Sequence, residues 1–107
     1  MIAHIVLFTP RANLSARERD DLVRAFTISL EKIPSLRGSR VGRRVMHGRP
    51  YEGQMREHYE YAAILEFDDV SGLKAYLEHP AHEQLGQLFF SALERALIYD
   101  YDLASGL

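Results

Sequence analysis

Cysteine is absent from this sequence of 107 residues. A chain without cysteine forms no disulfide, offers no thiolate nucleophile and builds no thiolate metal site. A marked excess of charge of one sign is also lacking, since 13 lysines and arginines against 15 acidic residues give a formal net charge of −2. Because binding to phosphates normally requires a clear basic excess, nucleic acid is not an expected partner.

Long apolar runs are missing as well, and none reaches the roughly 20 residues that a membrane-spanning helix needs, so no membrane association is expected. The stretch IAHIVLF at 2–8 has neither the basic start nor the cleavage-like end of a signal peptide. We therefore expect a cytoplasmic protein. A chain of this length predicts one domain over residues 1–107. Its core would be small, so burial in an oligomer would help to stabilise it.

Four segments have the composition or alternation of β-strands. They span residues 2–9, 38–46, 58–67 and 96–103, of which the second is the weakest because it contains glycines. In the first strand, His4, Val6 and Phe8 share one face. Both faces of the strands look apolar, so we expect both to be covered. The stretch 47–57, marked by two glycines and a proline, is expected to be a loop.

Helix signals lie between the strands. Ser15 and Glu18 fit a capping box that opens a helix to about Lys32. Asp69 can cap a short helix over 70–78. Since proline suits the first turn of a helix but not its interior, we expect a break at His79 and a new helix from Pro80 to about Arg95. The inward positions of these helices are predicted to be Leu22, Phe26, Leu30 and Ile33; Val70, Leu73, Tyr76 and Leu77; and Leu85, Leu88, Phe89 and Ala92.

The resulting order, β-α-β-β-α(α)-β, predicts an α+β fold of the ferredoxin-like split βαβ type with a four-stranded antiparallel sheet. Helices would cover one face of that sheet and leave the other face bare. Two such sheets facing each other in a homodimer, a dimeric α+β barrel, would cover both bare faces.

Residues 76–82, YLEHPAH, hold the main candidates for chemistry. With Pro80 at the first helical position, His82 lies in the first turn, where the helix dipole disfavours the imidazolium form. Such a histidine can accept a proton near neutral pH. Tyr76 precedes the break, which would fold the two side chains toward one space. A phenol that hydrogen-bonds a carbonyl oxygen beside an imidazole that removes a carbon-bound proton makes an enolisation site without metal or cofactor.

The same residues also allow structural interpretations in place of an enolisation site. His82 could cap its helix while Tyr76 serves as an amphipathic core residue. His4, the one polar residue of an apolar strand, is either a third pocket group that orients a substrate oxygen or a hydrogen-bonded core histidine. A metal site would have to use His79 and His82 with Glu78 or Glu83, but Pro80 interrupts the helical spacing of the pair. We therefore predict no metal.

Five arginines form the main basic concentration: Arg37, Arg40, Arg43, Arg44 and Arg49. They could hold an anionic substrate group or a carrier phosphate, or they could simply protect a solvated strand edge against pairing with other sheets. No G-x-S-x-G, P-loop or G-x-G-x-x-G motif occurs, so hydrolase and nucleotide-binding functions lack support.

With these residues in view, the chain resembles the stress-responsive A/B barrel (Dabb) family of the dimeric α+β barrel superfamily. The resemblance covers essentially the whole chain and is carried by HIVLF at 4–8, EF at 66–67, YLEHPAH at 76–82 and DY at 100–101. It implies the fold and homodimer described above. The family includes small stress-associated dimers and an enzymatic branch, the plant polyketide cyclase that makes olivetolic acid by intramolecular aldol condensation.

The resemblance to that branch implies catalytic roles for His82 and Tyr76, which match its histidine and tyrosine, with no cofactor. His4 and Gly86 match two further positions. The apolar pocket of the branch implies substrate-binding roles for Val6, Phe8, Leu22, Phe26, Leu77, Leu85, Leu93 and Ile98. Leu85 and Leu93 replace aromatic bulk of the branch, and the 47–57 loop is longer and more basic, so a different apolar, polyketide-like ligand is expected.

Three functions follow as hypotheses. The first is a cofactor-independent cyclase or lyase acting on a poly-β-carbonyl chain, with His82 as general base and Tyr76 as hydrogen-bond donor. The second is a non-catalytic stress-responsive dimer or small-ligand-binding module, in which the hydroxyl and imidazole only satisfy local groups. The third, a cofactor-free oxygenase, is supported by the shared fold alone.

Overall fold

The computed structural model describes residues 1–104, whose backbone elements follow the predicted order. The strands are β1 (Ile2–Pro10), β2 (Gly38–Arg43), β3 (Tyr61–Phe67) and β4 (Leu93–Asp102). The helices are α1 (Ala16–Leu30), α2 (Pro50–Gln54), α3 (Val70–Glu78) and α4 (Pro80–Ala92). Within residues 1–104 the four strands form one antiparallel sheet in the order β2-β3-β1-β4. This is the ferredoxin-like α+β fold that the sequence predicts.

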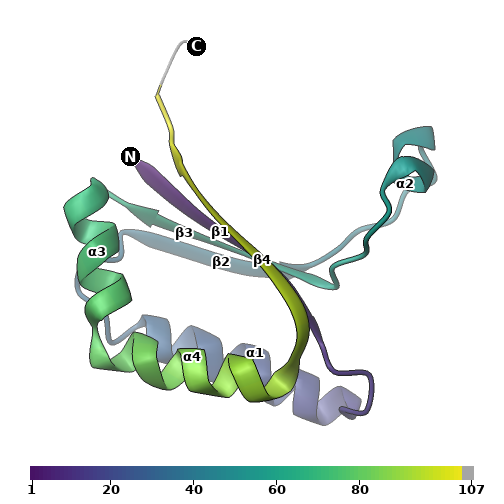
Figure 1. The fold of residues 1–107 in the computed structure, drawn as a ribbon, viewed down its shortest axis with the longest axis horizontal. Coiled ribbons are helices and arrows are strands. Elements are labelled where there is room, and N and C mark those ends of the chain that lie inside the picture. Colours follow the sequence, from purple (N-terminus) through teal and green to yellow (C-terminus); the bar gives the residue numbers. More distant parts are fainter. Residues whose placement is uncertain (105–107) are drawn as a thin grey trace.

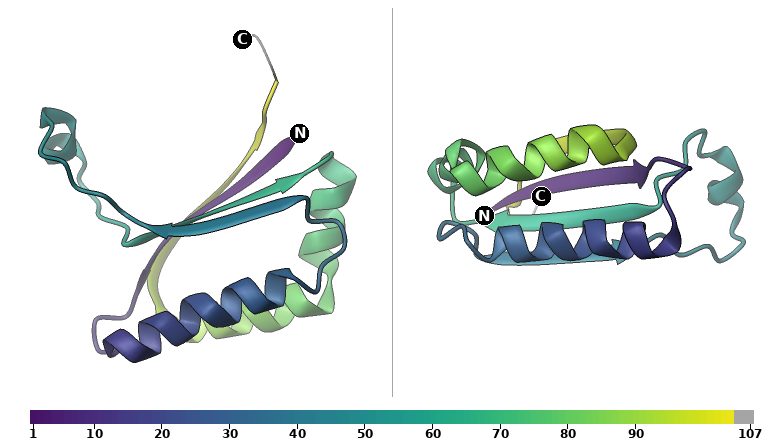
Figure 2. Two further views of the ribbon diagram at one scale, coloured as in Figure 1. Left: turned by 180° about the vertical axis from the view of Figure 1, so that it is seen from behind. Right: turned by 90° about the horizontal axis from the view of Figure 1, so that it is seen from below.

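Two layers make up the body of the molecule. Helices α1 and α4 lie side by side against one face of the twisted sheet, and α3 stands at the end of the sheet where β3 ends (Figures 1 and 2). The opposite face, called the outer face below, carries no helix within residues 1–104. The expectation that both faces of the strands are covered is therefore met only on the helical side of this single chain.

The core lies between the helices and the sheet. Alternation along β1 turns His4, Val6 and Phe8 toward the helices, and all three are buried. Tyr61, Ala63, Leu65 and Phe67 of β3 face the same way. The side chains of Phe8, Phe26, Phe89 and Tyr61 pack in one aromatic cluster, with ring centroids 5.0 to 6.3 Å apart. Aromatic pairs at such distances stabilise a core beyond the area they bury.

Local signals account for the helix starts. The Ser15 hydroxyl accepts from the Glu18 amide, and the Glu18 carboxylate accepts from the Ser15 amide, which completes the predicted capping box. Asp69 caps α3 through the Gly72 amide. The predicted break at His79 and the start of α4 at Pro80 are also confirmed.

Some boundaries and inward positions differ from the predictions. Helix α4 ends at Ala92 rather than Arg95, because Leu93 and Arg95 pair with β1 as the start of β4. Three positions predicted to face inward, Val70, Leu77 and Leu88, are 38–50% exposed because α3 and α4 pack on their neighbours through narrower stripes than the apolar pattern suggests.

The predicted loop at 47–57 contains the short helix α2. The carboxylate of Glu52 accepts hydrogen bonds from the backbone amides of His47 and Gly48 and thereby closes the turn that precedes the helix. Residues 44–60, called the arm below, extend away from the layered body (Figures 1 and 2). Because α2 buries none of its residues, local hydrogen bonds rather than core packing shape the arm.

Candidate functional site

The break between α3 and α4 rests on His79 and Pro80. His79 ends α3 and is also the N-cap of α4, and its Nδ1 accepts from the Ala81 amide at 3.0 Å. Pro80 occupies the first helical position, where its missing amide hydrogen costs no bond. The cap of α4 is therefore His79, and the interpretation of His82 as the cap is wrong.

Around this break the structure brings Tyr76 and His82 together. Tyr76 is the last buried residue of α3, at 2% exposure, and the ring of His82 packs edge-on against it with 4.7 Å between centroids. His82 is itself only half-buried, so its ring meets Tyr76 on one side and solvent on another. The helix break thus gives a phenol and an imidazole on successive helices a common space.

His4 reaches the same tyrosine from the sheet. Its ring lies edge-on to Tyr76 with 5.5 Å between centroids, so Tyr76 stands between two imidazoles. His4 is 4% exposed, and its Nδ1 lies 2.5 Å from Oδ1 of Asp100 on the neighbouring strand β4. The cluster therefore consists of Asp100, His4, Tyr76 and His82, from β4, β1, α3 and α4.

Asp100 is the member of the cluster that the sequence does not predict. In the sequence, the DY pair at 100–101 carries only a resemblance to the family. Its carboxylate meets His4 because β1 and β4 are antiparallel and their register places residue 4 opposite residue 100. The alternation of β4 was a signal for the side of the sheet on which Asp100 lies, but the pairing of the first strand with the last becomes known only from the fold.

Electrostatics keep the phenol and the second imidazole uncharged near neutral pH. Burial and the negative charge of Asp100 raise the pKa of the Tyr76 phenol. Burial, with a smaller contribution from the nearby His4, lowers the pKa of His82, against an opposing effect from the Leu77 carbonyl. A protonated phenol can donate a hydrogen bond, and a neutral imidazole can accept a proton. The cluster thus pairs a donor with an acceptor.

The apolar residues assigned to the substrate pocket fall into two groups. Val6, Phe8, Leu22, Phe26 and Leu85 are 0–5% exposed and form part of the packed core. Leu77 and Ile98 are 41% and 56% exposed, and Leu93 is half-buried. Ile98 lies on the same face of β4 as Asp100, so it borders the open side of the cluster. Gly86 is exposed, and a Cβ there would meet nothing within 4 Å.

Within residues 1–104, two cavities lie away from this cluster. One, of about 820 Å³, is on the outer face of the sheet, and the other, of about 380 Å³, is lined by Asp20, Val23 and Arg43 among others. Neither borders Tyr76 or His82. The larger one was not anticipated as a cavity, although its arginines belong to the basic concentration noted in the sequence.

Within residues 1–104 no group of three or more histidines and carboxylates is arranged to hold a metal ion. The lone pair of His79 Nδ1 is occupied by the Ala81 amide. In the same range no helix is both long and apolar enough to span a bilayer.

The sheet order and the imidazole–phenol cluster define a small ferredoxin-like α+β protein with a polar group of side chains between its helices and its sheet. Residues 2–103 match the Stress responsive A/B Barrel Domain, and the chain belongs to that family. The family resemblance noted from the sequence is thereby confirmed.

Among its relatives, the chain is 22% identical to olivetolic acid cyclase from Cannabis sativa over 100 residues, 94% of each protein. Its fold is similar to that of a hydroxynitrile lyase from Passiflora edulis, with a TM-score of 0.86, 17% identity, and 99% of this chain and 95% of the lyase covered. A dimeric protein of unknown function from Bacteroides fragilis is 26% identical, with a TM-score of 0.71 and 95% of both chains covered. The proteins that this chain is similar to thus include a cyclase and, by fold alone, a hydroxynitrile lyase.

Proposed function

We propose that this protein is a cofactor-independent cyclase or related lyase that acts on a small β-carbonyl substrate, with His82 as general base and Tyr76 as hydrogen-bond donor. The observation that carries the proposal is the edge-on pair of Tyr76 and His82 at 4.7 Å, whose two pKa shifts both favour the neutral forms. The similarity to olivetolic acid cyclase and to the hydroxynitrile lyase fold adds support.

In the proposed reaction His82 removes a proton from the carbon between two carbonyl groups of the substrate. Tyr76 donates a hydrogen bond to the oxygen on which negative charge develops. The resulting enolate attacks a second carbonyl carbon of the same chain, and the proton held by His82 returns to the new alkoxide. General acid–base catalysis by a positioned side chain typically contributes 10²–10⁴-fold to the rate, and a donor aimed at a developing oxyanion acts beside it.

His4 and Asp100 have supporting roles in this proposal. With Nδ1 donating to Asp100, the opposite nitrogen of His4, Nε2, is an acceptor, which can accept from the Tyr76 hydroxyl or from a hydroxyl of the substrate. The carboxylate thereby sets which nitrogen of His4 carries the proton, and His4 helps to position the substrate. The substrate would approach from the open side of the cluster, where His82 and Ile98 remain accessible.

The test is to assay cyclisation of candidate polyketide thioesters by the wild-type protein, by His82→Ala and by Tyr76→Phe. We expect His82→Ala to lose at least about 100-fold in turnover and Tyr76→Phe to lose less, because the phenylalanine keeps the packing and removes only the donor. Retained activity in both variants would rule out the assigned roles. His79→Ala, which removes a cap, is a control for damage to α4.

The second hypothesis, a non-catalytic dimer or ligand-binding module, draws on the packing of the same region. Five of the eight residues expected to line a substrate pocket are almost fully buried in the core, so little apolar space remains on that side of the cluster. If this hypothesis is right, Tyr76→Phe and His82→Ala lower stability without changing any turnover. Thermal unfolding of the two variants, measured beside the assay, distinguishes the cases.

We also propose that the protein forms a homodimer through the outer face of its sheet. Alternation places Ile5 and Leu7 on this face, with Ile64 of β3 and Tyr99 and Tyr101 of β4 beside them. The last three are 41–54% exposed in the single chain. An apolar sheet face of this kind is a typical protein–protein interface, and the Bacteroides fragilis relative is described as dimeric.

A further inference from the structure

The inner wall of the Tyr76–His82 cluster is closed by two apolar residues that follow its members along the chain. Val6 lies two residues after His4 on the same face of β1, and Leu85 lies three residues after His82 on the adjoining turn of α4. Both are 4% exposed and belong with Tyr76 to one apolar core. Because a side chain that lines a space large enough for water keeps accessible surface, the described part of the chain leaves no such space next to them.

Aromatic rings fill the core beyond these two residues. The ring of Phe89, one turn further along α4, lies 5.0 Å from that of Phe26 and 5.2 Å from that of Phe8, measured between centroids. The ring of Tyr61 stacks on that of Phe8 at 5.3 Å. Phe8 and Phe26 are 0% and 1% exposed. Since rings at these distances are in contact, the space between the helices and the sheet in residues 1–104 has no room for an alkyl chain.

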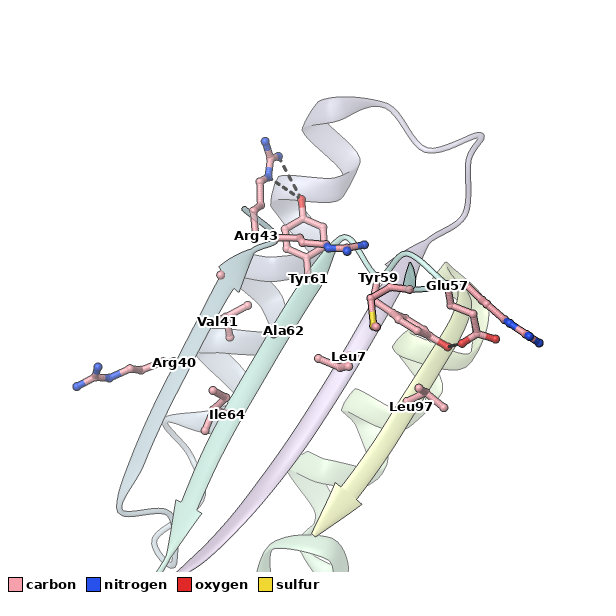
Figure 3. Close-up of a pocket in the computed structure, with 14 residues that line it drawn as sticks. Leu7, Arg40, Val41, Arg43, Glu57, Tyr59, Tyr61, Ala62, Ile64 and Leu97 are labelled. Atoms are coloured by element: carbon pink, nitrogen blue, oxygen red, sulfur yellow. Dashed lines mark hydrogen bonds between the residues drawn. The ribbon is translucent and has the colours of Figure 1, made fainter. Parts of the chain in front are cut away.

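The larger cavity does not extend the site either. It lies on the outer face of the sheet beside the arm, where Leu7, Ala62 and Ile64 line it (Figure 3). Leu7 alternates with Val6 along β1, so the sheet itself stands between this cavity and Tyr76. The proposed dimer also forms through this face, so the openness of the cavity is that of a single chain.

The cluster opens toward strand β4. Tyr76 is 2% exposed, whereas His82 is half-buried and the side chain of Asp100 is 42% exposed. Ile98, on the same face of β4 as Asp100, is 56% exposed. A substrate therefore enters between the start of α4 and β4. The thioester or ester group that links it to a carrier remains on this open side, so the far end of the substrate points toward Leu85.

We propose that Leu85 and Val6 restrict the site to β-carbonyl substrates whose far end is as short as a methyl group, and that they exclude substrates with an alkyl tail. This inference rests on the proposed function, because it concerns the substrate of the same site. An alkyl tail would have to displace buried side chains, and overpacking a filled core is unfavourable. The apolar, polyketide-like ligand expected from the sequence is thereby narrowed to one without a tail.

The experiment compares two N-acetylcysteamine thioesters with the same reacting groups, 3-oxobutanoyl and 3-oxoheptanoyl. The second is longer by a propyl chain's worth of carbon, which is what Leu85→Ala removes from the core. Exchange of the C2 protons in D₂O gives kcat/KM for each thioester. We expect the wild type to prefer the shorter one at least about 10-fold, because a single methylene in a closed pocket changes kcat/KM by roughly 10-fold or more. Leu85→Ala should shift this preference toward the longer thioester at least about 10-fold.

Further variants test whether the effect belongs to this position. Leu85→Met conserves the side-chain volume and should keep the wild-type preference. Ile33→Ala removes the same number of carbons from a 3% exposed residue between α1 and β2, so it should lower stability and keep the preference. If Leu85→Ala does not fold, Val6→Ala, which leaves a smaller space, takes its place with the same expected shift.

Binding is measured apart from turnover with pentane-2,4-dione and octane-2,4-dione, followed through the ring resonances of His82. Stronger binding of the shorter dione without any proton exchange would support the size limit and refute the proposed catalysis. Equal kcat/KM for two thioesters that both react, equal affinity for the two diones, or an unchanged preference in the folded Leu85→Ala or Val6→Ala variant would each overturn the size limit. So would the absence of binding by either dione.

Discussion

The Nδ1 atom of His4 lies 2.5 Å from Oδ1 of Asp100, so a carboxylate of the last strand binds a buried imidazole of the first strand. The two residues are 96 positions apart in the chain and are brought together by the antiparallel register of β1 and β4. His4 in turn contacts the edge of Tyr76. A substitution at Asp100 should therefore alter the surroundings of the Tyr76 phenol through the imidazole of His4.

The first prediction concerns this carboxylate. Asp100→Asn keeps the shape of the side chain but removes its charge, and a hydrogen bond to a charged group contributes about 1.5–3 kcal/mol. We expect the tautomer preference of His4, measured by long-range ¹H–¹⁵N NMR, to weaken, and the turnover of the proposed reaction to fall about 10-fold or more. Asp102→Asn, two residues along β4 and also exposed, is the matched control. Unchanged His4 resonances in Asp100→Asn would show that Asp100 does not set the tautomer of His4.

The second prediction is a pH dependence that follows from His82. Its pKa in the folded protein is lowered from 6.5, so the folded state disfavours the imidazolium. We therefore expect kcat/KM to hold its value as the pH falls through 6.5 and to decrease only below it. Titration of the His82 ring by NMR measures the same pKa, and a midpoint above 6.5 would contradict the prediction.

The free energy of unfolding changes with pH in the same direction as kcat/KM, because both decrease as the pH falls below 6.5. Below pH 6.5 the unfolded chain takes up a proton at His82 that the folded chain resists, so the free energy of unfolding decreases as the pH falls from 6.5 toward the folded pKa. Since His82 is only half-buried, solvent screens part of this effect. Chemical denaturation at pH 7.5 and 5.5 measures this effect. Between these two pH values the free energy of unfolding should decrease less for His82→Gln than for the wild type.

The third prediction addresses the outer face of the sheet. Tyr99→Asp introduces a charge into the proposed dimer interface, and we expect sedimentation at micromolar concentration to show a dimer for the wild type and a monomer for the variant. Phe90→Asp is the control, because Phe90 is 87% exposed on α4, away from that face. A wild-type protein that sediments as a monomer counts directly against the dimer.

The fourth prediction concerns the arm that forms one side of the cavity. Glu52→Ala removes the acceptor of the His47 and Gly48 amides, so proteolysis within residues 44–60 should become faster. The melting temperature should change little, because α2 buries no residue in the core. Glu52→Gln keeps an acceptor oxygen, so its rate of proteolysis should lie between those of the wild type and Glu52→Ala. A large loss of global stability in Glu52→Ala would show that the arm contributes to the core.

Much of the fold was predictable because local physical chemistry specifies it. The capping box at Ser15, the Asp69 cap and the proline at the start of α4 each set a boundary through one or two side chains. Alternation likewise gave the correct face of β1 for His4, Val6 and Phe8. The end of α4 was misjudged because Leu93–Arg95 are compatible with a helix, and only their pairing with β1 makes them strand.

In the candidate site, too, the residues close in sequence were predictable and those brought together by strand pairing were not. Tyr76 and His82 are near in sequence, so the helix break predicted their meeting, and the structure brings them together. Asp100 and the outer-face cavity depend on which strands become neighbours, and no short stretch of sequence carries that information. The α2 helix escaped prediction because a glutamate that binds two backbone amides creates it, in a segment whose glycines and proline indicate a loop.

Proton abstraction from carbon by His82 is the central claim, and it can be measured without knowing the natural substrate. An acetoacetyl thioester in D₂O exchanges its C2 protons for deuterium whenever a base removes them, and ¹H NMR follows the exchange. If His82 is the base, exchange by the wild type is at least about 100-fold faster than by His82→Ala at equal protein concentration, with an intermediate rate for Tyr76→Phe. Equal exchange rates for the wild type and His82→Ala would contradict the claim.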